Sequence, residues 1–167
     1  EECPPGPLLR CFLLSFRGRA PVREMKLYTF DGAPNPRRVH IFLNEKGIEL
    51  PFEQVDILKG KSRTPEFRKK VNSMGGLPVL ELDDGSHIAE SIAICRYFEA
   101  LCPEPPLFGV GAFGQAEIEM WQRRMEIKYL FPIMHTFRHT HPHMAKLEVP
   151  QIAAWGEANR PRVLDML

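Results

Sequence analysis

The sequence lacks any apolar run long enough to cross a membrane as a helix. Its longest mostly apolar stretch, residues 8–16, is interrupted by Arg10 and Ser15, whereas a spanning helix needs about 18 or more apolar residues. An excess of charge of one sign is also missing, because 22 Lys and Arg residues oppose 21 Asp and Glu residues. The net charge of +1 gives no drive toward non-specific nucleic-acid binding. We therefore expect neither a membrane nor a nucleic acid as partner.

Cysteine is scarce and forms no C-x-x-C pair. The four residues are Cys3, Cys11, Cys95 and Cys102. A disulfide scaffold is not expected at this density, which favours a reducing, cytoplasmic compartment. The spacing of Cys95 and Cys102 places them on one face of an expected helix, so they are interpreted as small buried hydrophobic residues.

The composition is that of a globular protein. Apolar residues make up 44% and charged residues 26% of the 167 residues, which excludes a disordered chain, a collagen or a coiled coil. The length fits one domain or two small ones. Residues 1–24 differ from the rest: a cluster of prolines precedes a short apolar run that has acids, not bases, before it. We expect this upstream segment to be disordered and outside the fold, with Met25 as the natural start.

Residues 25–102 predict an α/β domain with the order β-α-β-α-β-β-α. Asn35 before Pro36 predicts a helix with Asn35 as its N-cap, and Gly47 should end it. Ser91 is expected to cap the last helix of this domain. Alternation that ends in a hairpin indicates a mixed sheet with helices on its faces. The expected strands are 26–30, 52–57, 79–82 and 87–88, and the expected helices are 35–47, 64–71 and 91–102.

The rest of the chain reads as a linker followed by helices only. Residues 103–114 contain three prolines and three glycines and predict the linker. Residues 115–167 predict a partial all-α domain, with one helix from Gln115 to about Phe137 that Pro132 should kink, and another over 150–167 that Pro161 interrupts. Two helices with wide apolar faces cannot bury them alone, so we expect a C-terminal truncation.

Four segments, in this order and spacing, resemble a cytosolic glutathione S-transferase of the bacterial type. They are residues 26–30 running into 35–39, residues 72–80, residues 90–94, and the helical segment with Trp121, Arg123 and Arg124. The resemblance runs from Met25 to the end. It implies a thioredoxin-like glutathione-binding domain in which residues 33–36 replace a C-x-x-C, so dithiol chemistry is not expected. It also implies glutathione as co-substrate, a small hydrophobic electrophile as second substrate, a homodimer and a cytoplasmic location.

The resemblance assigns the parts of glutathione to particular residues. It implies a cis Leu77-Pro78 bond, with the Leu77 backbone pairing with the cysteinyl part. Glu90 and Ser91 would bind the γ-glutamyl end, since a helix N-terminus with a serine hydroxyl suits a carboxylate and an acid suits the ammonium. The cations Lys59, Lys61 and Arg63 lie where the family binds the glycine carboxylate, although each is interpreted equally well as a solvated loop residue.

Activation of the glutathione thiol is assigned to Asn35. The usual family serine falls on Ala33, and neither Ala33 nor Pro34 has a side-chain donor. Residues 33–35 resemble a T-P-N variant that uses the asparagine amide, with the threonine lost. The alternative, that Asn35 only caps its helix, stays open, and Tyr28 is the second candidate donor.

Four of the six histidines, at positions 135, 139, 141 and 143, lie within nine residues. The i, i+4 spacing of His135 and His139 fits a metal pair, but no complete ligand set is present, so no metal is expected. With Trp121 and Tyr129, His135 is expected to line the electrophile pocket, although any of them can instead serve packing.

Two other functions stay open at this point. A non-catalytic glutathione-transferase-like module for binding or dimerisation is favoured by Ala33 at the usual serine position. A glutathione-dependent thiol reductase would need a cysteine near Ala33, and the sequence has none there.

Overall fold

The computed structural model describes residues 25–142 and 148–159. The predictions for the upstream segment 1–24, for His143 and for the interruption at Pro161 lie outside the described residues. The chain divides into two compact units, one ending at Leu107 and one beginning at Phe108. Each unit is described by itself.

The first unit is built on a four-stranded mixed sheet, as the alternating pattern predicts. Its strands are β1 (Lys26–Thr29), β2 (Phe52–Gln54), β3 (Val79–Glu81) and β4 (His87–Ala89). They lie in the order β2-β1-β3-β4. β1 runs parallel to β2 and antiparallel to β3, and β3 and β4 form the antiparallel hairpin.

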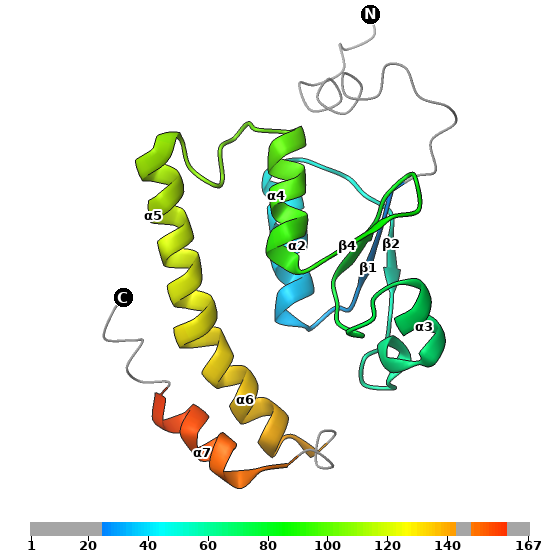
Figure 1. The fold of residues 1–167 in the computed structure, drawn as a ribbon, viewed down its shortest axis with the longest axis vertical. Coiled ribbons are helices and arrows are strands. Elements are labelled where there is room, and N and C mark those ends of the chain that lie inside the picture. The colour runs from blue at the N-terminus through cyan, green and yellow to red at the C-terminus, as the bar shows by residue number, and fades with distance from the viewer. Residues whose placement is uncertain (1–24, 143–147, 160–167) are drawn as a thin grey trace, which may run out of the picture. The chain divides into compact units, whose positions relative to one another are not determined.

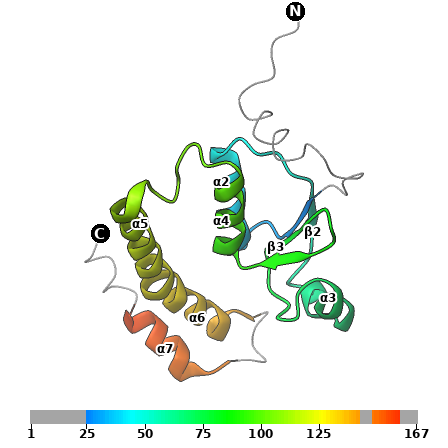
Figure 2. The ribbon, with the colours of Figure 1, turned by 45° about the horizontal axis from the view of Figure 1, so that its top comes forward.

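Helices cover both faces of this sheet. Helices α2 (Pro34–Glu45) and α4 (Ser91–Leu101) lie side by side on one face, and the short α3 (Pro65–Lys70) lies on the other (Figures 1 and 2). Side chains alternate along a strand, so Thr29 of β1 reaches His40 of α2, while Tyr28 packs against Phe67 of α3. This confirms the thioredoxin-like fold.

The main core lies between the sheet and the pair α2 and α4. Its members are apolar side chains with little or no exposure: Leu27, Val39, Leu43, Leu80, Ile94, Cys95 and Phe98. A smaller cluster of Tyr28, Val55 and Val79 lies under α3 and is completed by Phe67 and Val71. The buried Cys95 confirms its interpretation as a small hydrophobic residue.

Two predicted helix caps are wrong by one or two residues. Ala33 is the N-cap of α2, and Asn35 is the second residue of the helix. The fixed φ of Pro34 suits the first helical position, which starts the helix before Asn35. Likewise Glu90 is the N-cap of α4, and Ser91 is its first residue. The predicted stop at Gly47 is confirmed: its φ is 61°, and the Ile48 N–H donates to the Leu43 carbonyl, as in a Schellman motif.

A buried lysine ties the ends of α2 and α4 together. Lys46 is completely buried, and its Nζ lies 2.5 Å from a carboxylate oxygen of Glu99. It also donates to the Cys102 carbonyl at 2.7 Å and to the Pro105 carbonyl. A charge can be buried at tolerable cost only when it is paired and hydrogen-bonded. Lys46 thus links the end of α2 to the end of α4 and to the segment that follows it.

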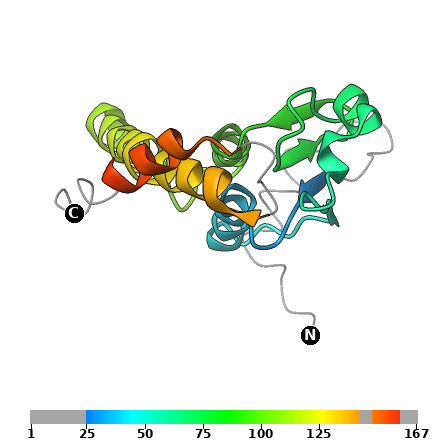
Figure 3. The same cartoon turned by 90° about the horizontal axis from the view of Figure 1, so that it is seen from below.

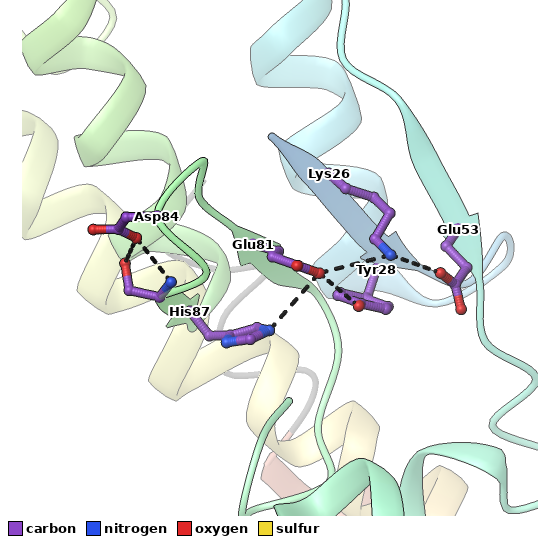
Figure 4. Close-up of polar contacts among 7 residues, drawn as sticks. Lys26, Tyr28, Glu53, Glu81, Asp84 and His87 are labelled. Atoms are coloured by element: carbon purple, nitrogen blue, oxygen red, sulfur yellow. Dashed lines mark hydrogen bonds and ion pairs between the residues drawn. The ribbon is translucent and has the colours of Figure 1, made fainter. Parts of the chain in front are cut away.

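The face of the sheet that carries α3 also holds a row of polar side chains, one or two from each strand (Figure 4). Lys26 lies 3.0 Å from Glu53 and 3.6 Å from Glu81. The Tyr28 hydroxyl donates to Glu81 at 2.7 Å, and His87 Nε2 lies 3.9 Å from the same carboxylate. The Tyr28 hydrogen bond and the Lys26 charge lower the pKa of Glu81, against the opposing effect of burial. Burial and the bond to Glu81 raise the pKa of Tyr28.

The second unit is helical, with α5 (Gly111–Arg124), the π-helical segment η2 (Met125–Leu130), α6 (Phe131–Thr140) and α7 (Pro150–Asn159). α5 begins at Gly111, not at the predicted Gln115, so residues 111–114 of the predicted linker form its first turn. The π-helical segment ends at Leu130, two residues before Pro132, which cannot donate a helical hydrogen bond. No helix of the described residues is long and apolar enough to cross a membrane.

Helices α6 and α7 pack closely (Figure 3). Gly156 of α7 makes this approach possible. A Cβ at this position would lie 2.5 Å from Thr136 Oγ1 and 2.7 Å from the Pro132 carbonyl oxygen.

We predict that Lys46→Met lowers the free energy of unfolding by about 3 kcal/mol or more, because it removes a buried ammonium that contacts the Glu99 carboxylate and two backbone carbonyls. Urea unfolding followed by circular dichroism measures this. Lys70→Met is the matched control, since Lys70 pairs with Glu66 at the surface of α3, and its urea midpoint should stay nearly unchanged. Equal midpoints for the two variants would contradict the prediction.

We also predict a pH-dependent cost for Tyr28→Phe. The pKa of Glu81 is lowered from 4.5 in the folded protein. The ionised Glu81 carboxylate therefore stabilises the folded state above pH 4.5, and this contribution is lost as the pH falls further. The variant should be about 1 kcal/mol less stable than the wild type at pH 7, and the difference should shrink below pH 4.5. Tyr129→Phe is the control, and its difference from the wild type should not depend on pH in this range.

Candidate functional site

The sheet brings three predicted segments to one edge. The end of β1 leads into the first turn of α2, which holds Asn35. Because β3 runs antiparallel to β1, with Val79 opposite Tyr28, the Leu77-Pro78 segment enters the sheet beside the end of β1. Ala89 lies opposite Val79, so β4 ends at this edge and Glu90-Ser91 follows at once.

The Leu77-Pro78 bond is cis, as predicted, with Pro78 completely buried. The loop before it is braced by Asn72, which the sequence analysis did not single out. Its side-chain amide donates to the Gly76 carbonyl at 3.0 Å and accepts from the Met74 N–H at 3.0 Å. Gly75 has a φ of 65°, and a Cβ there would lie 2.8 Å from the Ser62 carbonyl. These contacts therefore fix the conformation of the loop up to Leu77.

Glu90 and Ser91 form a sharp turn into α4. Glu90 has a φ of 72°, a strained conformation that no other non-glycine residue adopts in the part of the chain that the structure describes. Glu90 is exposed, whereas Ser91 is buried. The Ser91 hydroxyl accepts a hydrogen bond of 2.9 Å from Arg38 Nη1 of α2. Sequence reasoning missed Arg38, whose only local signal was its position one turn beyond Asn35.

The structure places Asn35, the predicted donor, at the protein surface. It lies in the first turn of α2 and is exposed. α2 has no side-chain cap and no acidic residue in its first turn, so the positive end of the helix dipole is not neutralised from within the helix.

Tyr28 lies on the other face of the sheet. Its ring meets Phe67 of α3 edge-on at 5.9 Å, and its hydroxyl donates to Glu81. Since α2 lies on the opposite face, Tyr28 is not placed beside Asn35. The suggestion that Tyr28 is the second candidate donor does not fit this geometry.

The three candidate cations lie in and around the short 3-10 helix η1 (Lys61–Arg63) and are all exposed. Lys59 Nζ lies 3.3 Å from the Asp56 carboxylate. The Lys59 N–H, more than its ammonium, lowers the pKa of that carboxyl. Lys61 and Arg63 are therefore the better placed of the three to meet an added anion.

The candidate pocket residues of the second unit have different environments. Trp121 is exposed on α5 with the Arg124 guanidinium 5.0 Å from its ring centre, and Tyr129 is half-buried in η2. His135 packs between α6 and α7, with ring centres 4.3 Å from Phe131 and 6.1 Å from Trp155. Burial, more than the neighbouring charges, lowers its pKa.

The histidine pair takes part in helix packing. The rings of His135 and His139 are parallel, with centres 5.9 Å apart, and His139 Nδ1 accepts the Val149 N–H at 3.2 Å at the start of α7. Within residues 25–142 and 148–159, no three His, Cys, Asp or Glu side chains are grouped so that they could hold a metal ion.

Comparisons with known proteins identify the family of the chain. Residues 27–106 match the family model described as the N-terminal domain of glutathione S-transferase. The chain is 36% identical to glutathione S-transferase 2 of Saccharomyces cerevisiae, over 93% of this chain and 67% of the relative. It is 34% identical to elongation factor 1-gamma 1 of Oryza sativa subsp. japonica, over 57% of this chain and 22% of that protein.

A solved structure shows the same fold. It is a glutathione S-transferase domain-containing protein of Marinobacter aquaeolei, 33% identical with a TM-score of 0.79, and the match covers 85% of this chain and 72% of that one. The fold, the sequence identity and the family match lead to the same conclusion. The chain belongs to the glutathione S-transferase family.

Proposed function

We propose that the protein is a glutathione transferase, in which the thiolate of bound glutathione attacks a small hydrophobic electrophile in the cytoplasm. The observation that carries the proposal is the meeting of three segments at one sheet edge: the first turn of α2, the cis Leu77-Pro78 bond and the strained turn at Glu90. Family membership supports the same activity.

The two ends of glutathione carry charged groups, and these segments and the loop of Lys61 offer groups that can bind each of them. The Leu77 backbone would bind the cysteinyl part in strand-like fashion. The Ser91 hydroxyl and the first N–H groups of α4 suit the γ-glutamyl carboxylate, and the exposed Glu90 suits the ammonium beside it. Lys61 and Arg63 would take the glycine carboxylate, with Lys59 already paired to Asp56.

The chemistry then depends on stabilising a thiolate. A free thiol has a pKa of about 8.5, and each unit by which the pKa is lowered needs about 1.4 kcal/mol of differential stabilisation. The Asn35 amide can donate to the sulfur, and the N-terminal end of α2 adds a favourable field. The thiol proton leaves to solvent. A sulfur–carbon bond then forms at the electrophile while the bond to its leaving group breaks.

The second candidate function is a non-catalytic glutathione-binding or dimerisation module. Ala33 at the usual serine position favours it, and so does the match to a protein named as an elongation factor. Retention on glutathione resin, followed by a conjugation assay with 1-chloro-2,4-dinitrobenzene, separates the two functions. Binding with turnover supports the enzyme, and binding without turnover supports the module.

We predict that Asn35→Ala raises the pKa of the bound glutathione thiol by about one unit or more and lowers turnover near pH 7. Glutathione affinity should change little, because the proposed contacts of Leu77, Glu90 and Ser91 remain. The ultraviolet absorbance of the thiolate, titrated against pH, measures the pKa. Because Ala33 is the N-cap of α2, the melting temperature should stay nearly constant. Asn44→Ala, at an exposed position near the end of the same helix, is the control. An unchanged thiol pKa in Asn35→Ala would leave Asn35 without a catalytic role.

We also propose that the protein forms a homodimer, through the loop of Met74 and the helices after Ser91 and after the linker. The Met74 side chain is 79% exposed, so an interface at this loop would remove its apolar surface from water. At micromolar concentration the protein should sediment as a dimer, and Met74→Asp should shift it toward the monomer. Leu58→Asp, in another exposed loop, is the control. Unchanged sedimentation of Met74→Asp would contradict this interface.

A further inference from the structure

Arg38 lies between α2 and α4, beside a residue proposed to bind the γ-glutamyl end of glutathione. Its guanidinium reaches from the second turn of α2 to the first residue of α4, where Nη1 donates to Ser91 Oγ at 2.9 Å. Ser91 is only 5% exposed, so this bond is largely shielded from water. The positive charge also acts on Cys95, one turn further along α4, where it opposes the effect of burial on the thiol. Two observations therefore place the charge of Arg38 against the start of α4.

The hydrogen bond fixes what the Ser91 hydroxyl can do. A serine hydroxyl has one proton to donate and two lone pairs that accept. Since Arg38 has no acceptor, it occupies a lone pair of Ser91 and leaves the hydroxyl proton for another group. α4 has no side-chain cap and no acidic residue in its first turn. An anion at this helix start would therefore meet a pre-oriented hydroxyl, free N–H groups and a nearby fixed positive charge.

We infer that Arg38 is a positioning residue for glutathione, which holds the Ser91 hydroxyl toward the γ-glutamyl carboxylate and adds a positive charge beside it. The inference rests on the proposed function and deepens it. Arg38 acts through Ser91, and its effect should be confined to the carboxylate end of the ligand.

The test compares two ligands that differ only at that end. They are glutathione and γ-aminobutyryl-cysteinyl-glycine, which lacks the γ-glutamyl carboxylate. Dissociation constants are measured by calorimetry for the wild-type protein, Arg38→Met and the matched control Arg37→Met, which removes the same charge from the exposed neighbouring position. Melting temperatures of all variants are measured alongside.

Arg38→Met should weaken glutathione binding at least about tenfold, because the γ-glutamyl carboxylate loses a nearby positive charge and the Ser91 hydroxyl loses the bond that orients it. Binding of the analogue should not change, and Arg37→Met should bind both ligands like the wild type. Equal weakening of both ligands by Arg38→Met would assign it a purely structural role and overturn the inference. Unchanged glutathione binding would overturn it too, while the proposed function would stand. A wild-type protein that binds neither ligand would overturn both.

A second comparison covers the case in which Arg38→Met does not fold. Arg38→Lys keeps the charge but replaces the planar guanidinium with a point donor. Ser91→Ala removes the hydroxyl that Arg38 holds. If Arg38 acts through Ser91, Arg38→Lys should weaken glutathione binding in the wild-type background and have a smaller effect in the Ser91→Ala background. Equal effects in the two backgrounds would overturn the inference.

Discussion

The buried ammonium of Lys46 determines how α2 and α4 lie against each other. These helices run in the same direction and are joined at both ends. Arg38 bonds Ser91 near their starts, and Lys46 contacts Glu99 and the Cys102 carbonyl near their ends. A parallel pair held at two points cannot easily slide or splay. Because both helices begin at the candidate site, the relative position of their first turns depends on contacts made at the other end of the unit.

The sheet supplies the second constraint on the site. The antiparallel pairing of β3 with both β1 and β4 brings three distant parts of the sequence to one edge. Polar groups on the two faces of the sheet differ in whether they already have partners within the protein. The face under α3 carries the compensated row of Lys26, Glu81 and their neighbours, where each charge has a partner (Figure 4). The helix starts on the other face have N–H groups without side-chain caps, which leaves them for a ligand.

The element order and the sheet type could be predicted from the sequence because they follow from local patterns. The proline after Asn35, the glycine at position 47 and the alternation of strands and helices each have a local physical cause. Helix starts are less predictable. Pro34 and Pro36 both suit the first turn of α2, and either Glu90 or Ser91 can precede the first residue of α4. The sequence predicts the start of α5 too late, because the glycines before Gln115 are typical of a linker. The Arg38–Ser91 and Tyr28–Glu81 bonds each span 53 positions, and no local pattern reports such contacts.

The π-helical segment η2 (Met125–Leu130) affects how this chain is compared with its relatives. A single π turn holds one residue more than the α-helical turn that it replaces. The wider turn takes up the extra residue, so each structural position beyond it is occupied by a residue one place later in the sequence, and residues one place apart point about 100° apart around the helix axis. A relative whose helix is α-helical throughout would carry its equivalent of His135 one position earlier. An ungapped alignment with such a relative would therefore pair residues from different faces, and assignments carried across it would need a one-residue gap near Leu130.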